Sequence, residues 1–445
     1  MRFGDTIAAI ATPPGNGGVG IIRISGDAVV QIAAGLSKKS LKPRLASFTH
    51  FLDAEQRIID SGLLIYFPGP SSFTGEDVLE VQAHGGRVVL DMLLRRVLEL
   101  GARLAQPGEF SQRAFLNDKI DLAQAEAIAD LINSGTEQAA RSAQQSMQGV
   151  FSQQINQLIA QLIELRVYIE AAIDFVDEEI DFLSQGSVAD KIIGLQQHVA
   201  EIKNTAAQGR LLRDGMTVVL AGKPNAGKSS LMNALAGYDA AIVADIAGTT
   251  RDVLRERIQI DGMPLHIIDT AGLRETENQV EQEGIRRAQH EMERADKVLL
   301  LLDSAGSDQE NVNEYLPAGV AVTRVFNKID ISGKAPALVD SGDRVDIYLS
   351  VKTGEGMDLL KQHLKQSVGF GLGDESVFIA RRRHIEALTM AERAIQDALA
   401  QLAVAAPELV AEELRQAQYA LSEITGEFTS DDLLGEIFSS FCIGK

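Results

Sequence analysis

Hydrophobic and polar residues change their rhythm several times along this chain. Up to residue 118, short apolar runs alternate with turns rich in Gly and Pro. Apolar runs bounded by such turns are typical of β-strands, and they occur at Thr6–Ala11, Val19–Ile24, Gly62–Phe67 and Val78–Val81. Together with one helical pattern, they predict an α+β domain over residues 1–118.

Two segments carry the three- and four-residue spacing that puts apolar side chains along one side of a helix. The first segment, Val88–Leu100, has its apolar stripe at Val89, Met92, Leu93, Val97 and Leu100. The second belongs to Ala-, Gln-, Leu- and Ile-rich sequence and has no Gly or Pro between Val150 and Gln185. Its stripe consists of Phe151, Ile155, Leu158, Leu162, Ile169 and Ile173. We therefore predict a long helix within a helical segment over residues 119–212.

Residues 213–375 alternate again, now between short β runs and helical stretches. The β runs are Thr217–Ala221, His266–Asp269, Val298–Asp303, Ala321–Phe326 and Asp346–Leu349. This alternation is typical of a parallel sheet wrapped by helices. Helical sequence resumes over residues 376–445. The predicted fold is therefore a multidomain α+β and α/β chain, in which an α/β domain is inserted into a helical domain whose two parts pack together.

The chain is strongly acidic. Its 445 residues include 42 Lys and Arg against 62 Asp and Glu, which gives a net charge of −20. Nucleic-acid binding through the overall field is disfavoured, because phosphate binding relies on Lys and Arg that displace counterions. Any nucleic-acid contact must be local or shared with a partner.

Cysteine content and hydropathy argue against a disulfide-rich, zinc-binding or membrane-spanning protein. Cys442 is the single cysteine, which excludes an internal disulfide framework, and the seven His residues offer no zinc-binding spacing. The longest apolar runs, such as Val298–Leu302, fall far short of the roughly 20 residues that span a bilayer. We expect a cytoplasmic protein without a membrane segment.

One motif carries clear chemistry. Gly222-Lys223-Pro224-Asn225-Ala226-Gly227-Lys228-Ser229 matches G-x-x-x-x-G-K-S, and it lies between the predicted strand Thr217–Ala221 and the helical sequence Ser230–Leu235. Backbone N–H groups at the start of a helix favour an anionic phosphate. The Lys of this motif supplies a charge to the β- and γ-phosphates, and its Ser hydroxyl can ligate Mg²⁺. The motif therefore predicts a nucleotide-binding P-loop.

Four further motifs belong to the same chemistry. Asp269-Thr270-Ala271-Gly272 ends an apolar strand, where P-loop NTPases hold an acidic residue near Mg²⁺ and a Gly whose N–H senses the γ-phosphate. Asn327-Lys328-Ile329-Asp330 also ends a strand, and an Asp there accepts from N1–H and the exocyclic amine of guanine. Ser350-Val351-Lys352 resembles the last base-contacting loop, and Gly248-Thr249-Thr250-Arg251-Asp252 supplies hydroxyls for a Mg²⁺-sensing switch loop. This order predicts a Ras-like GTPase domain.

The residue that would position the attacking water is left open by these motifs. Ras-like GTPases have a Gln after the D-x-x-G glycine, but this chain has Leu273, which cannot hydrogen-bond water. Another group must take the role. Residue type alone offers Glu275, Glu277, Glu281 and Glu283.

With these motifs placed, the whole chain closely resembles the MnmE (TrmE) family of tRNA-modification GTPases. The GTPase motifs are shared by many proteins, whereas the N-terminal blocks and the C-terminal tetrapeptide are specific to this family. The segments that carry the resemblance outside the GTPase motifs are Asp5–Ala9, Ala11–Gly15, Gly17–Gly26, Phe73–Glu80, His84–Gly86, Pro107–Phe110, Ala114–Lys119 and Phe441–Lys445.

The resemblance implies an architecture and a reaction. The family has a folate-binding N-terminal domain that forms a homodimer, a discontinuous helical domain and an inserted GTPase domain. It works with the flavoprotein MnmG, which implies a heterotetramer, and installs an aminomethyl-type group on C5 of the wobble uridine of certain tRNAs. A 5-formyl or 5,10-methylene tetrahydrofolate supplies the carbon, ammonia or glycine supplies the amine, and GTP hydrolysis drives a conformational cycle.

The resemblance also implies one-carbon site residues. Arg23, Glu80, Lys119 and Lys445 match the folate-contacting positions of the family. Their chemistry suits a pterin, whose amide and amine edges pair with a carboxylate and whose glutamyl tail attracts cations. Cys442 belongs to the same tetrapeptide, either as a nucleophile for uridine C6 or as a positional residue beside the folate.

In the GTPase domain, Glu281 matches the catalytic glutamate of the family, acting on the attacking water through a water bridge. The implied K⁺ ligands are Asn225, the carbonyls of Ala244 and Ile246, and the Thr249 position, with Ser229 and Thr250 on Mg²⁺. A bound K⁺ would take the charge-stabilising role of an arginine finger. Ala244 stands where Thr is expected, which matters little if its carbonyl is the ligand. The implied GTP-binding residues are Asn225, Ala226, Gly227, Lys228, Ser229, Ser230, Ala244, Asp245, Ile246, Ala247, Gly248, Thr249, Thr250, Asp269, Thr270, Ala271, Gly272, Asn327, Lys328, Asp330, Ser350, Val351 and Lys352.

Some alternatives stay open. The basic cluster Arg381-Arg382-Arg383-His384 is either a tRNA contact or part of a domain junction. A ribosome-assembly GTPase without one-carbon chemistry would share the GTPase motifs, and a stand-alone folate aminomethyltransferase would leave the GTPase domain unexplained. The N-terminal blocks and the residues Cys442–Lys445 favour the tRNA-modification reading.

Overall fold

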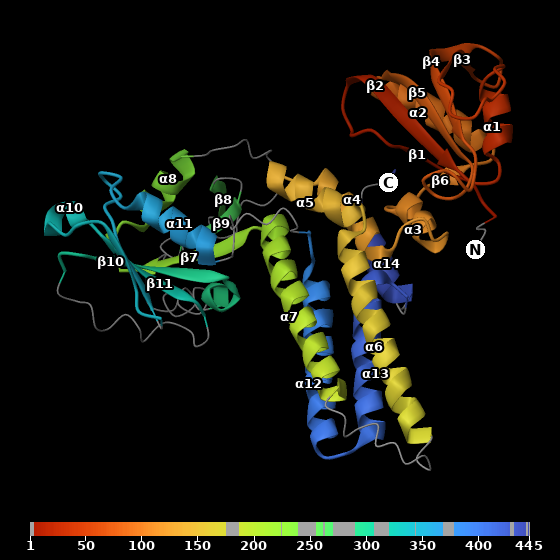
Figure 1. Cartoon of the computed structure of the whole chain (residues 1–445). Coiled ribbons are helices and arrows are strands. Elements are labelled where there is room, and N and C mark those ends of the chain that lie inside the picture. The colour runs from red at the N-terminus through yellow and green to blue at the C-terminus, as the bar shows by residue number, and fades with distance from the viewer. Residues whose placement is uncertain are drawn as a thin grey trace, which may run out of the picture. The chain divides into compact units, whose positions relative to one another are not determined.

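The computed structural model describes residues 4–174, 187–223, 225–238, 255–260, 263–269, 290–306, 320–342, 344–367, 378–427, 431–441 and 444. The chain divides into two compact units (Figure 1). The first unit comprises Met1–Ile132, Ser146–Val199 and Ala387–Lys445, and the second comprises Asn133–Gln145 and Ala200–Glu386. Each unit is therefore assembled from segments that are distant in sequence.

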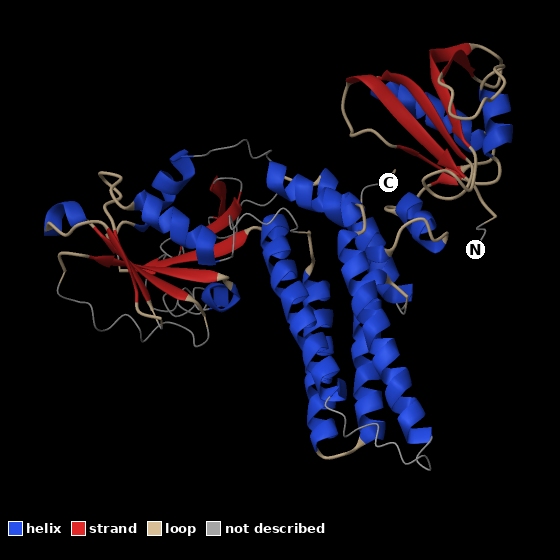
Figure 2. Ribbon diagram, viewed as in Figure 1, coloured by secondary structure: helices blue, strands red, loops and turns tan. Residues whose placement is uncertain are grey.

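A six-stranded sheet forms the N-terminal part of the first unit, with the order β3-β4-β5-β2-β1-β6 (Figure 2). Neighbouring strands pair antiparallel except for β6, which runs parallel to β1. The strands are β1 (Ile7–Ile10), β2 (Gly17–Ser25), β3 (Ser47–Leu52), β4 (Ile58–Phe67), β5 (Val78–Gly85) and β6 (Arg103–Leu104).

Helices α1 (Val29–Leu36) and α2 (Arg87–Glu99) pack against one face of this sheet. Their core includes Ile22 and Ile24 of β2 together with Leu79 and Val81 of β5. Because side chains alternate along a strand, Arg23 of β2 and Glu80 of β5 lie on the opposite face, here named the open face, which Phe110 covers in part beside Ile7 and Ala9 of β1. The apolar stripe predicted for Val88–Leu100, which corresponds to α2, was partly wrong.

In α2, the buried apolar residues are Leu90, Leu93 and Val97, whereas Met92 is 44% exposed. The helix is rotated relative to the predicted stripe because its core neighbours lie on the sheet and on α1. Val89 and Leu100 are partly buried against the same core.

Helices make up the rest of the first unit. Five of the six predicted stripe residues of α6 (Val150–Asp174) are fully buried, and Ile173 is partly buried. The α6 helix packs against α13 (Pro407–Thr425), where Arg166 Nη1 donates to Gln418 Oε1 at 2.6 Å. The other helices of this part are α3 (Glu109–Leu116), α4 (Leu122–Ile132) and α14 (Asp431–Ser439), while α5 (Glu137–Met147), α7 (Ser187–Asp214) and α12 (Arg382–Ala403) each contribute residues to both units.

The second unit is built on a seven-stranded sheet with the order β12-β13-β11-β10-β7-β9-β8. Its five central strands are parallel, and both edge strands, β8 and β12, are antiparallel to their neighbours. The two edge strands were not predicted. The strands are β7 (Met216–Gly222), β8 (Arg255–Ile260), β9 (Met263–Asp269), β10 (Lys297–Asp303), β11 (Val322–Asn327), β12 (Ala337–Asp340) and β13 (Val345–Tyr348).

Two apolar clusters cover the two faces of this sheet, because alternate residues of β7 and β10 belong to different clusters. Helices α8 (Lys228–Tyr238) and α11 (Met357–Ser367) supply residues to one of them, and the short α10 (Ile329–Ser332) follows β11. Across the residues that the structure describes, no helix combines the length and apolarity needed to cross a membrane.

Candidate functional site

The predicted nucleotide motifs meet at one edge of the second sheet. The P-loop follows β7, Asn327 ends β11, Ser350 lies just beyond β13, and Asp269 ends β9. These four strands run parallel, so their carboxyl ends lie together. The carboxyl edge of an open α/β sheet is the usual place for a ligand site.

Glycine is required at two positions of the P-loop. Gly222 has φ 141° and Gly227 has φ 102°, in the region that disfavours L side chains. A Cβ on Gly227 would also lie 2.3 Å from Asn327 Nδ2. Asn225 has φ 63°, a left-handed conformation that Asn tolerates better than most residues. The loop is thereby folded tightly around the start of α8.

Lys228 is held inside this loop. Its Nζ donates to the carbonyl oxygens of Gly222 at 2.8 Å and Lys223 at 3.0 Å, and the residue is only 6% exposed. Ser229 and Ser230 are exposed at the first turn of α8. A cation and a helix N-terminus at one point form an environment suited to phosphate.

Asn327 joins the phosphate side of the site to the side that would hold the base. Its Nδ2 donates to Ala226 O at 2.9 Å, and its Oδ1 accepts from Val351 N at 3.0 Å and Lys328 N at 2.8 Å. Asn327 is 4% exposed, so these bonds replace water for a buried amide. The P-loop and the loop after β13 are therefore fixed to each other by one side chain.

Asp330 is exposed at the same edge. Its Oδ1 accepts from the Ser350 hydroxyl at 2.7 Å, which fixes the carboxylate while leaving its outer edge open. Lys328 Nζ donates to Asp303 Oδ2 at 2.8 Å, and this bond, followed by the Ala305 N–H bond, lowers the pKa of Asp303. A fixed carboxylate can accept two parallel hydrogen bonds from a base edge.

Several predicted site residues lie outside the described residues. They are Ala244, Asp245, Ile246, Ala247, Gly248, Thr249, Thr250, Thr270, Ala271, Gly272, the four candidate glutamates including Glu281, Cys442 and Lys445.

The predicted one-carbon residues Arg23 and Glu80 form an ion pair on the open face of the first sheet. Arg23 Nη2 donates to Glu80 Oε1 at 2.9 Å, and both side chains are partly buried. Arg23 Nη1 also donates to the carbonyl of Gly444 at 3.4 Å, across 421 positions of sequence. The C-terminal tail therefore reaches this pair.

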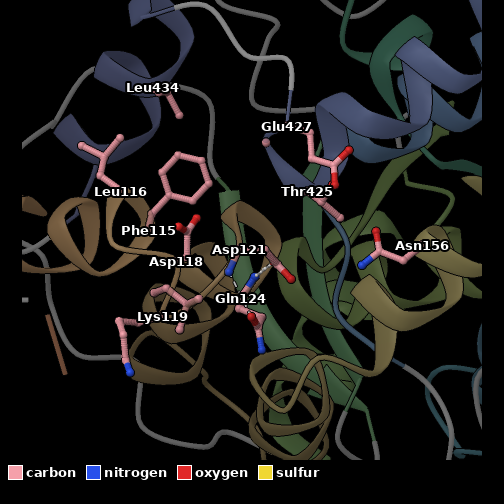
Figure 3. Close-up of a pocket in the computed structure, with 12 residues that line it drawn as sticks. Phe115, Leu116, Asp118, Lys119, Asp121, Gln124, Asn156, Thr425, Glu427 and Leu434 are labelled. Carbon is pink, nitrogen blue, oxygen red and sulfur yellow. Dashed lines mark hydrogen bonds between the residues drawn. The ribbon is translucent and has the colours of Figure 1, made fainter. Parts of the chain in front are cut away.

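The loop over residues 68–77, between β4 and β5, lies close to both Arg23 and Lys119. The Arg23 guanidinium lies 5.8 Å from the centre of the Phe73 ring. A Cβ on Gly75, whose φ is 79°, would lie 3.4 Å from the aliphatic carbons of Lys119. Lys119 also lines a cavity of about 770 Å³ whose other lining residues include Asp118, Asp121, Gln124, Asn156 and Glu427 (Figure 3). Neither Arg23 nor Glu80 lines this cavity.

Sequence reasoning gave no role to the buried charges that hold this loop. Arg113 of α3 is fully buried and pairs with Glu76 of the loop at 3.1 Å, Asp5 at 2.6 Å and Glu109 at 3.0 Å. Glu76 also accepts from the Ser25 hydroxyl at 2.8 Å. The sequence did single out these acids, since they lie in the blocks that carried the family resemblance. Spacing along the sequence, however, does not show which charged side chains form ion pairs.

The fold and the site define a P-loop GTPase: a phosphate loop before a helix, joined by Asn327 to the loop after β13 that also holds the Asp330 carboxylate, on a mainly parallel sheet. Family models identify the family to which the chain belongs. The model described as GTP-binding protein TrmE N-terminus matches residues 6–119, and the MnmE helical domain matches residues 122–442. The chain belongs to the MnmE family of tRNA modification GTPases.

Curated relatives agree over the full length. A tRNA modification GTPase MnmE of Yersinia pseudotuberculosis serotype IB (strain PB1/+) is 58% identical over 454 residues, covering 100% of both chains. One from Histophilus somni (strain 129Pt) is 58% identical over 449 residues and covers 99% of each. Among solved structures, the G domain of the T. maritima FeoB iron transporter is 27% identical over 34% of this chain and 98% of its own, with a TM-score of 0.27.

Proposed function

We propose that this GTPase is potassium-dependent and, with the flavoprotein MnmG, modifies C5 of the wobble uridine of certain tRNAs. A tetrahydrofolate derivative, in the 5-formyl or 5,10-methylene form, serves as the one-carbon donor, and Mg²⁺ accompanies GTP. The observation that carries this proposal is the bond from Arg23 to the Gly444 carbonyl. It brings the family-specific tail to the family-specific sheet, which a GTPase acting only as a switch would not need.

The residues of the GTP site have separate roles in this proposal. Lys228 pairs with the β- and γ-phosphates after exchanging its two loop carbonyls for phosphate oxygens, and Asp330 selects guanine. Ser229 and Thr250 would hold Mg²⁺. Asn225, with the carbonyls of Ala244 and Ile246 and the Thr249 position, would hold K⁺, which supplies positive charge to the transferring phosphoryl group when bound. Glu281 orients the attacking water through a second water.

In the one-carbon site, Glu80 binds the pterin and Arg23 holds that carboxylate in place. Lys119 and Lys445 attract the glutamyl tail, and Lys119 is partly supported in this role by its position beside Gly75. Cys442 is positioned by the same tail, as a thiolate nucleophile or as a neighbour of the folate. We further propose that the N-terminal domain forms the homodimer and that the assembly with MnmG is a heterotetramer.

Exchange of monovalent cations tests the GTPase part. In K⁺, hydrolysis should be much faster than in Na⁺ at equal ionic strength, and Asn225→Ala should remove most of the difference while nucleotide binding persists. Glu281→Gln should lower turnover in K⁺ without weakening GTP binding. Equal rates in the two cations would remove the potassium site from the proposal.

Binding of 5-formyl tetrahydrofolate tests the one-carbon part. Equilibrium dialysis should show stoichiometric binding to the full-length protein and a large loss in Arg23→Ala. Arg57→Ala is the matched control, because Arg57 lies in the same domain, pairs with acids and is 73% exposed at its side chain. Absence of binding to the unaltered protein would favour a GTPase without one-carbon chemistry.

A further inference from the structure

One stretch of the first unit departs sharply from the acidity of the chain. Residues 28–52 contain no Asp or Glu, although the chain has 62 of them, and they hold Lys38, Lys39, Lys42 and Arg44 within seven positions. All four cations are exposed in the segment between α1 and β3. Among the residues that the structure describes, no carboxylate lies within ion-pair distance of these four side chains. The stretch therefore forms a local patch of positive charge.

Several other exposed cations are paired. Arg141 with Glu137, Arg382 with Glu386 and Arg393 with Asp397 form ion pairs one helical turn apart. The cluster at residues 381–384 thus differs from the 38–44 segment, since His384 is buried and Arg382 has an acidic partner. Among the described residues, the α1–β3 segment stands out because four exposed cations without a carboxylate in ion-pair distance lie within seven positions of sequence.

This segment is fixed to the sheet. Arg44 N donates to Tyr66 O at 2.8 Å, and Pro43 forms a bridge with the same residue of β4. Arg44 has φ 59°, which is uncommon for a residue with a Cβ, and its Nη2 donates to Ser71 O. Ser71 belongs to the 68–77 loop, two residues before Phe73, whose ring faces Arg23. Arg44 is therefore anchored beside the loop that borders the Arg23 ion pair, and the three lysines precede it by two to six positions.

An exposed aromatic residue follows these cations in the sequence, four positions after Arg44. Phe48 is 63% exposed on β3, the edge strand of the sheet. It pairs with Leu63, which pairs with Gln82, which pairs with Ile21, so these four side chains share the open face with Arg23 and Glu80. Three strand spacings separate Phe48 from Ile21, about 14 Å. The ring can stack on a base while the neighbouring cations contact phosphates.

We propose that Lys38, Lys39, Lys42, Arg44 and Phe48, here named the basic edge, form a tRNA-binding surface. The lysines contact backbone phosphates, and Phe48 stacks on an unpaired base near the uridine that is modified. This inference rests on the proposed function and gives it a substrate-binding surface. Phosphate neutralisation by exposed cations and base stacking on an aromatic side chain are the two usual elements of single-stranded RNA binding.

Titration of tRNA binding against salt tests the basic edge. The probe is a 3′-labelled, unmodified tRNA transcript with a wobble uridine, and the full-length protein is assayed by fluorescence anisotropy with and without MnmG. The test variant is Lys38→Gln/Lys39→Gln/Lys42→Gln, which keeps Arg44 and its backbone anchor. The control Arg87→Gln/Arg141→Gln/Arg393→Gln loses the same charge at side chains that are 88%, 77% and 85% exposed and that lie outside the basic cluster at residues 381–384.

The lysine variant should bind at least about tenfold more weakly at 0.1 M salt, with a salt slope shallower by about 2 to 3, because each phosphate contact contributes about 0.7 to 0.9 to that slope. The control should bind like the unaltered protein, and GTP hydrolysis should be unchanged in both. Phe48→Ala should weaken binding with the slope retained.

Three results would overturn the basic edge. The unaltered protein could fail to bind tRNA without MnmG, the lysine variant could match the control, or the lysine variant could keep tRNA binding but lose its homodimer or its complex with MnmG. The last result would make the surface a protein interface. Failure of the proposed function is seen separately, as absence of the modified nucleoside in cells that carry the unaltered protein.

Discussion

Asn327 has the most connected side chain of the nucleotide site. Its amide binds the P-loop through Ala226 O and the base loop through Val351 N, so two segments separated by more than a hundred positions keep one geometry. The motif predicted Asn at this position without revealing these partners. Asp330, by contrast, is exposed and accepts a hydrogen bond from the Ser350 hydroxyl, and its role in guanine recognition stays a prediction.

Asp330→Asn should shift base preference from guanine towards xanthine. An Asn offers one donor and one acceptor where the carboxylate offers two acceptors, so it pairs poorly with N1–H and the amine of guanine and better with the 2-oxo edge of xanthine. Competition of GTP and XTP for a fluorescent nucleotide measures the preference. Unchanged preference for GTP would show that Asp330 does not read the base.

Arg113→Met should strongly destabilise the N-terminal domain. The substitution leaves Glu76, Glu109 and Asp5 without their shared cation, and loss of one partner of a buried ion pair costs about 3–5 kcal/mol. Arg103→Met is the control, because Arg103 pairs with two of the same acids but its side chain is 45% exposed. Calorimetric scans should show a much larger fall in melting temperature for Arg113→Met. Equal falls would contradict the assignment of Arg113 as the organising charge.

At the scale of elements, sequence periodicity predicted the interior of the molecule better than its edges. The strands that carry the site, such as β7 and β10, were predicted because long apolar runs are buried on both faces. The edge strands β8 and β12 lack that signal, since an edge strand is partly polar and its pairing is non-local. The edge strand β3 was missed for the same reason, and helix α1 was also not predicted. The domain boundaries at residues 118, 212 and 375 stay predictions.

In the candidate site, too, the sequence predicted local features better than contacts between distant residues. Contiguous motifs predicted the P-loop and the position of Asp330 at the same edge of the sheet, because both depend on local backbone conformation. The resemblance implied only that Arg23 and Lys445 belong to one folate site, so the contact between Arg23 and Gly444 was not predicted, and the charges around Arg113 were not assigned. Both depend on side chains far apart in sequence, whose meeting is decided by the packing of whole elements.

Helix α11 packs over a buried pair that makes stability depend on pH. Lys297 Nζ lies 3.0 Å from His363 Nε2, with Thr323 Oγ1 at 2.9 Å from the same nitrogen. Burial, followed by the charge of Lys297, lowers the pKa of His363 to about 4, although Asp340 raises it. Burial lowers the pKa of Lys297 to about 8.

Both folded pKa values are below the ordinary 6.5 and 10.5, so the unfolded chain binds more protons in each interval. Stability should therefore rise with pH between about 4 and 6.5 through His363, and between about 8 and 10.5 through Lys297. Urea unfolding followed by circular dichroism measures this. His363→Gln should flatten the acidic interval, whereas exposed His290→Gln should not. The same acidic slope in both variants would exclude His363 as its source.

At the scale of the molecule, a net charge of −20 coexists with a tRNA substrate because charge is distributed unevenly. Phosphates respond to the field within about one Debye length, roughly 8–10 Å at moderate salt. A small group of unpaired cations can therefore act against a distant excess of acid. Arg23 of the N-terminal sheet donates to the carbonyl of Gly444, while the unit with the P-loop is built mainly from the middle of the sequence.

Nucleoside mass spectrometry of bulk tRNA tests the central claim most directly. Host cells that lack this gene and any redundant enzyme are compared with the same cells carrying the gene or Lys228→Ala. We predict that a C5-aminomethyl-type uridine is absent from the deletion, returns with the unaltered gene and does not return with Lys228→Ala. An unchanged nucleoside profile in the deletion would contradict wobble-uridine modification and leave a GTPase with another role.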